Sequence, residues 1–122
     1  MLTRLSAAML ALFAVGVVTT SIEAHPTLKS ASPAVDGTVA APTEIKLSFS
    51  EGVILKFSSV ELKDQAGKTL TTGRLATDPK DHKQLIVPLQ VPLVAGTYTI
   101  KWNVVSDDTH RVNGSYSFKV DR

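Results

Sequence analysis

A strict alternation of apolar and polar residues is the feature that most constrains the fold of this chain. From Tyr98 to Val104, the even-numbered positions carry large apolar side chains and the odd-numbered positions carry polar ones. Successive side chains of a β-strand point to opposite faces of a sheet, so this pattern predicts a strand with one buried face. Residues 45–50 and 116–121 alternate in the same way. Helix signals are absent after residue 24, and the pattern therefore predicts an all-β domain.

Turn residues divide the predicted strands at short intervals. Further strands are expected near residues 60–63 and 85–89, the latter ending or lying at an edge because of Pro88. Polar turn segments separate the strands at residues 64–68, 78–83 and 94–96, and an irregular crossing segment occupies residues 31–43. About seven short strands fit an antiparallel Greek-key barrel or sandwich of cupredoxin-like or immunoglobulin-like type. Trp102 is expected to pack between the sheets.

The N-terminal segment differs from the rest of the chain. Arg4 precedes an apolar run that extends to Val18, followed by polar residues and a small residue at Ala24. This order predicts a secretory signal peptide over residues 1–24. An uncleaved anchor is disfavoured because the run is shorter than the roughly 20 residues that span a bilayer. The signal peptide would direct export to the periplasm, and its cleavage after Ala24 would release a mature domain of residues 25–122.

The composition of this expected mature chain limits its chemistry. The sequence has no cysteine, and its two methionines, Met1 and Met9, both lie in the predicted signal peptide. Disulfides, thiolate metal sites, iron–sulfur clusters and cysteine nucleophiles are therefore excluded. The formal net charge is only +2, and no basic run accompanies it, so no nucleic-acid partner is expected.

His25 would become the first residue of the mature chain. Its free α-amine and one ring nitrogen could then bind a single metal ion as a chelate. An α-amine titrates near pH 8, so a metal can displace its proton at modest cost. Pro26 has no backbone N–H that could become a further ligand.

A second set of donors lies in residues 106–110. In an extended segment, Asp108 and His110 would project to the same side, whereas Asp107 would face solvent or cap the turn. The alternative is a hydrophilic loop without a ligand role. With His25, the pair would supply three nitrogens and one oxygen, a set that suits Cu(II), although zinc stays possible.

Two further residues have weaker claims to a metal-binding role. Glu51 ends a predicted strand and could be an axial ligand, a group that orients a ligand imidazole, or an exposed acid. His82 lies between charged neighbours in a polar segment and is expected to be solvated surface.

Five segments, one of them Ala41-Pro42, together resemble the CopC/PcoC family of periplasmic copper-resistance proteins. The other four segments are residues 25–34, 47–51, 102–110 and 114–118. The resemblance implies a cupredoxin-like Greek-key β-barrel that binds Cu(II) through His25, Asp108 and His110, with Glu51 at or near the site. Some members also have a methionine-rich Cu(I) site. The absence of methionine after residue 24 predicts that this protein binds Cu(II) only, one ion per chain.

The favoured hypothesis is a monomeric periplasmic carrier or buffer for Cu(II), without enzymatic activity. The resemblance implies that a CopD-like inner-membrane protein exchanges copper with it. A copper-dependent oxidative enzyme with a histidine-brace site is the first alternative, disfavoured because the Trp and Tyr residues are in phase with the core. The second alternative is an immunoglobulin-like interaction module that binds no copper.

Overall fold

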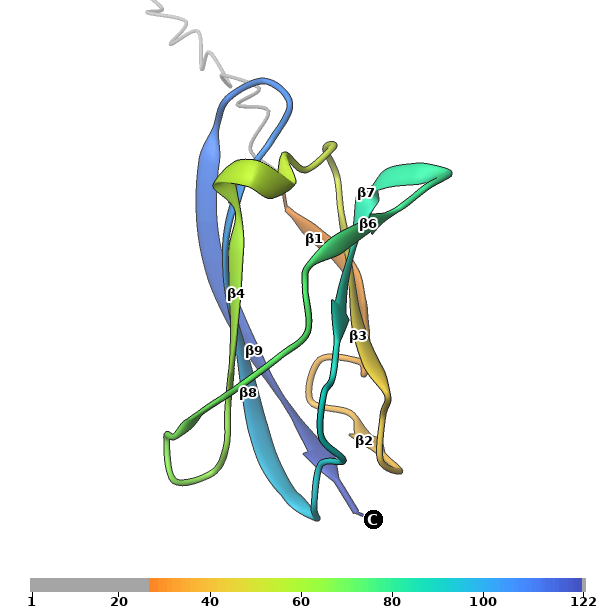
Figure 1. The fold of residues 1–122 in the computed structure, drawn as a ribbon, viewed down its shortest axis with the longest axis vertical. Coiled ribbons are helices and arrows are strands. Elements are labelled where there is room, and N and C mark those ends of the chain that lie inside the picture. Colours follow the sequence, from red (N-terminus) through yellow and green to blue (C-terminus); the bar gives the residue numbers. More distant parts are fainter. Residues whose placement is uncertain (1–26, 122) are drawn as a thin grey trace, which may run out of the picture.

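The computed structural model describes residues 27–121, and in them two β-sheets pack face to face (Figure 1). The predicted signal peptide and His25 lie outside the described residues. The strands are β1 (Leu28–Ser32), β2 (Thr38–Val39), β3 (Glu44–Phe49), β4 (Ser59–Lys63), β5 (Thr69–Leu70), β6 (Ala76–Asp78), β7 (Asp81–Pro88), β8 (Gly96–Val105) and β9 (Arg111–Val120). A single 3-10 turn, η1 (Leu55–Phe57), precedes β4. No helix in this described part is long and apolar enough to cross a bilayer.

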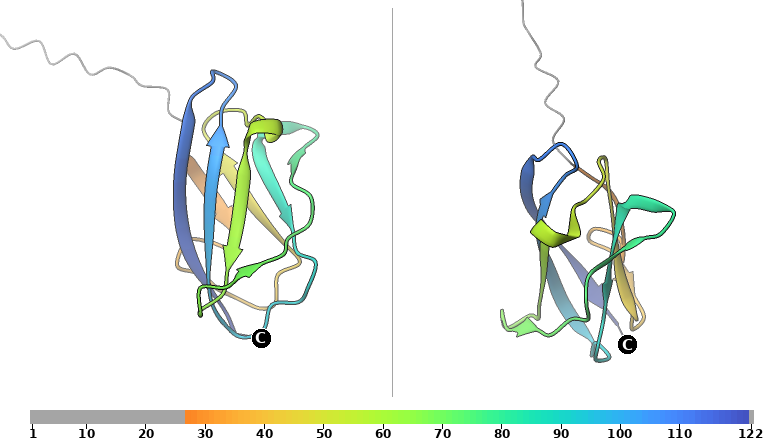
Figure 2. Two further views of the ribbon diagram at one scale, coloured as in Figure 1. Left: turned by 60° about the vertical axis from the view of Figure 1, so that its left-hand side comes forward. Right: turned by 45° about the horizontal axis from the view of Figure 1, so that its top comes forward.

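The sheets form a sandwich and not a closed barrel. One sheet has the order β1-β3-β7-β6 and the other the order β2-β9-β8-β4-β5, and the two layers are visible in Figure 2. All neighbouring strands are antiparallel except β2 and β9, which are parallel. The all-β prediction is confirmed. Of the two expected architectures, barrel and sandwich, the structure has the sandwich.

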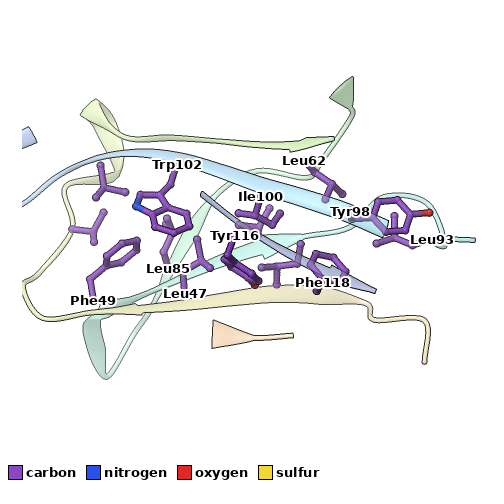
Figure 3. Packing of buried hydrophobic residues seen from close by; sticks show 14 of the residues in the cluster. Leu47, Phe49, Leu62, Leu85, Leu93, Tyr98, Ile100, Trp102, Tyr116 and Phe118 are labelled. Carbon is purple, nitrogen blue, oxygen red and sulfur yellow. The ribbon is translucent and has the colours of Figure 1, made fainter. Parts of the chain in front are cut away.

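Large apolar side chains from both sheets fill the space between them (Figure 3). Trp102 is 8% exposed, and its ring centroid lies 6.0 Å from that of Phe49 and 6.1 Å from that of Tyr116. The expectation that Trp102 packs between the sheets is confirmed. The alternation in β3, β8 and β9 thus arises because one face of each strand lines this core.

The segment 78–83 is not the polar loop that the sequence predicts. It is a tight hairpin in which Asp78 pairs with Asp81, so that His82 lies in β7. The Asp78 and Asp81 carboxylates each accept a hydrogen bond from the backbone N–H two residues later. The start of β7 is exposed, and without a buried face it leaves no apolar signal in the sequence.

Tyr116 links the crossing segment to β9 and gives a prediction about pH. Its buried hydroxyl donates a 2.8 Å hydrogen bond to the backbone oxygen of Pro33, and burial raises the pKa of Tyr116 to about 12. The folded protein binds this proton more tightly than the unfolded chain. The protonated hydroxyl therefore contributes fully to the free energy of unfolding below pH 10.0, and this contribution is lost as pH rises towards about 12. Urea unfolding should show wild type losing more stability over this range than Tyr116→Phe. Parallel pH profiles for the two proteins would contradict this assignment.

Candidate metal centre

The loop that joins β8 to β9 lies at one end of the sandwich, beside the turn that follows β3 (Figure 1, top). The N–H of Asp107 donates a 2.9 Å hydrogen bond to the oxygen of Gly52, and the N–H of Ile54 donates another, also 2.9 Å, to Val105. An isolated antiparallel bridge joins Val53 to Ser106. The backbone of residues 52–54 therefore supports the loop that carries the predicted ligands.

Asp108 and His110, the two predicted ligands in this loop, are in contact. The ring Nδ1 of His110 lies 3.0 Å from Oδ2 of Asp108. Their side chains are 36% and 51% exposed, so an ion could reach both from solvent. The Ser106 hydroxyl and then the His110 ring lower the pKa of Asp108 below its usual range, so the carboxylate is ionised near neutral pH. This pair can supply a carboxylate oxygen and an imidazole nitrogen to a cation.

The loop is a turn and not the extended segment from which the pairing was predicted. Thr109 has φ +69°, and its N–H donates a 2.8 Å hydrogen bond to the oxygen of Ser106. The N–H of Ser106 in turn donates to the oxygen of His110 at 2.9 Å. The two side chains therefore lie together because of this turn, and their role as metal ligands stays a prediction.

Asp107 is exposed, as predicted, but it also packs over the neighbouring turn. Its carboxylate lies so close to the Cα of Gly52 that any side chain at residue 52 would collide with it. A larger residue at this position would require the exposed Asp107 side chain to move aside. The sequence showed Gly52 only as the residue after a strand, because its contact with Asp107 joins segments that are distant along the chain.

Glu51 does not complete a three-ligand site with Asp108 and His110. Within residues 27–121, no three His, Asp or Glu side chains are grouped closely enough to hold a metal ion. Glu51 is half-buried in the turn after β3. The exposed His82 also lies at this end, because its backbone oxygen accepts a 3.0 Å hydrogen bond from the N–H of Val53.

Thr27, the first described residue, is fixed at the same end of the sandwich. Its N–H donates a 2.9 Å hydrogen bond to Oγ of Ser50, and its oxygen accepts one of 2.9 Å from the N–H of Ser50. The chain therefore enters β1 beside the turn that contains Glu51. His25 itself is outside the described residues, so its part in a metal site stays a prediction.

The fold and the Asp108–His110 pair define a small β-sandwich domain with donors for a metal ion at one end. The CopC domain matches residues 28–121, and the chain belongs to the CopC family. Protein YobA of Escherichia coli is 42% identical over 112 residues, which cover 91% of this chain and 90% of YobA. Copper resistance protein C of Escherichia coli is 39% identical over 107 residues, covering 82% and 84% of the two chains.

A solved structure gives the same result for the fold. The crystal structure of PcoC, a methionine-rich copper resistance protein from Escherichia coli, superposes with a TM-score of 0.72 at 39% identity. The match covers 80% of this chain and all of PcoC. The predicted resemblance to the CopC/PcoC family is confirmed.

Proposed function

We propose that this protein is a periplasmic copper resistance protein that binds one Cu(II) ion at the end of the sandwich formed by residues 50–54 and 106–110. The proposed ligands are the α-amine and ring of His25, a carboxylate oxygen of Asp108 and the ring of His110. The observation that carries the proposal is the solvent-accessible contact between Asp108 and His110 in a member of the CopC family.

The position of Thr27 supports the contribution of His25. Two residues of chain span at most about 7 Å, so the backbone of His25 must stay within that distance of Thr27. Thr27 is hydrogen-bonded to Ser50 at the end where Asp108 and His110 lie. Cleavage after Ala24 would therefore create a free amine near the pair, and the complete site would form only after export.

The donor set supports Cu(II) as the bound ion. Nitrogen and carboxylate donors suit Cu(II), whereas Cu(I) favours sulfur. PcoC is described as methionine-rich, but residues 25–122 of this chain contain neither methionine nor cysteine. We propose that this protein holds copper only as Cu(II) and has no sulfur-based Cu(I) site.

Exposure of the pair supports a role as carrier or buffer. Asp108 and His110 are open to solvent, so an incoming ligand could displace them one at a time. We propose exchange with a CopD-like inner-membrane protein, with this chain acting as a monomer. An oxidative enzyme is disfavoured because Tyr98, Trp102 and Tyr116 are all buried and cannot stack on a sugar substrate.

Removal of either loop ligand tests the site directly. Asp108→Ala and His110→Ala should each weaken Cu(II) binding on the order of 100-fold, equivalent to about 2.8 kcal/mol. Competition titration with a chelator and the EPR spectrum of the bound ion measure the effect. His82→Ala is the control, since it removes a histidine from the same end without touching the pair, and it should bind like wild type. An interaction module would show no tight Cu(II) binding in any of these proteins.

A further inference from the structure

Ser106 is buried in a place where an apolar residue would be expected. It has no exposed surface and is the one fully buried polar residue among those that the structure describes. It follows Val104 and Val105, which are both buried at the end of β8. Burying a hydroxyl costs roughly 1–3 kcal/mol unless it forms hydrogen bonds. Alanine would fill nearly the same space without this cost, so the hydroxyl requires an explanation.

The explanation lies in the bond from Ser106 to Asp108. The hydroxyl donates to Oδ1 of Asp108, because an ionised carboxylate can only accept. Its other neighbour, the backbone oxygen of His110, is 3.3 Å away. A hydroxyl has one proton, and a bond to a charged acceptor is stronger than one to a neutral carbonyl. Ser106 therefore holds Oδ1, while Oδ2 faces the His110 ring.

Backbone hydrogen bonds hold Ser106, and therefore its hydroxyl, in a fixed position. Ser106 pairs with Val53 in the turn after β3, and its own N–H and oxygen close the loop onto His110 and Thr109. Thr109 adopts a left-handed conformation that is unfavourable for a β-branched residue. The bonds from Ser106 on either side of Thr109 hold it in that conformation, and such local strain is concentrated at functional sites.

We infer that Ser106 is a positioning residue of the proposed copper site, which orients Asp108 so that its Oδ2 and the His110 ring meet one ion. The inference rests on the proposed function. Without the hydroxyl, the exposed Asp108 side chain would be held by its contact with the His110 ring alone, and metal binding would have to order it further. Groups that orient metal ligands in this way typically contribute 10–100-fold to metal affinity.

The test compares two serine deletions in the mature protein that begins at His25. Ser106→Ala should lower Cu(II) affinity by roughly 10–100-fold and alter the EPR spectrum of the bound ion. Ser58→Ala is the matched control. Its hydroxyl donates to Ile54 and accepts from the N–H of Val105 at the same end of the fold, without contacting Asp108. This control should lose stability in urea yet keep the wild-type EPR spectrum.

A double-mutant comparison separates positioning from general loosening of the loop. If Ser106 acts through Asp108, then Ser106→Ala should cause no further loss of affinity in an Asp108→Ala background. An equal loss in both backgrounds, or a wild-type spectrum and affinity in Ser106→Ala, would overturn the inference. If Asp108→Ala itself binds Cu(II) like wild type, it is the proposed site that fails. Should Ser106→Ala not fold, Ser106→Thr, which keeps the hydroxyl, must retain the wild-type spectrum.

Discussion

A mature chain acetylated on the α-amine of His25 is expected to lose most of its affinity for Cu(II), on the order of a thousandfold or about 4 kcal/mol. Acetylation converts the α-amine of His25 into an amide nitrogen and leaves no free amine beside it, so this nitrogen keeps its proton near neutral pH and no longer binds the metal. The chelate between the amine and the ring is lost. Pro26 cannot replace it, because its nitrogen carries no proton that a metal could displace.

Competition titration and EPR spectroscopy on the two proteins measure this loss. Urea unfolding of the two proteins is the control, since equal stabilities would show that acetylation has not disturbed the fold. The unblocked chain should also lose affinity as pH falls below about 8, where protons compete for the amine, and the acetylated chain should lack this component. Equal affinities for the two N-termini would exclude the amine as a ligand.

The fold was predicted best where a long strand has one buried face. β3, β8 and β9 alternate because their apolar side chains line the core. The shortest strands, β2 and β5, contain two residues each and are too short to show a period. The three-residue β6 is also too short to show one, and the described part of the chain has nine strands where about seven were expected. The start of β7 was missed for a different reason. Both of its faces are exposed, so no apolar residues mark it as a strand.

The candidate site was predicted only in part, because much of it depends on contacts between distant segments. The spacing of Asp108 and His110 suggested the pair, although the turn at Thr109, and not an extended segment, brings their side chains together. Ser106 and Gly52 could not be identified in the same way. The burial of Ser106 and the fit of Asp107 over Gly52 arise only when the turn after β3 meets the loop after β8. A serine directly after two buried valines was the available signal for Ser106.

Gly114 is expected to be the residue of β9 at which an added methyl group is most harmful to the fold. It lies directly opposite Trp102 in the pairing of β8 with β9. A Cβ atom at residue 114 would lie 2.5 Å from Cζ2 of Trp102, well inside normal contact distance. The indole cannot move away easily, because the rings of Phe49 and Tyr116 pack around it. The strand pairing and the position of the indole therefore require glycine here.

Gly114→Ala should lower the free energy of unfolding by about 3 kcal/mol, since overpacking a rigid core forces either the side chain or the strand to shift. Urea unfolding followed by Trp102 fluorescence measures both the stability and the environment of the indole. Ser115→Ala is the control, because it changes the next residue of the same strand on the exposed face and should leave stability nearly unchanged. If Gly114→Ala is as stable as this control, the indole must have a second position available between the sheets. The packing of the indole against β9 would then not require glycine at residue 114.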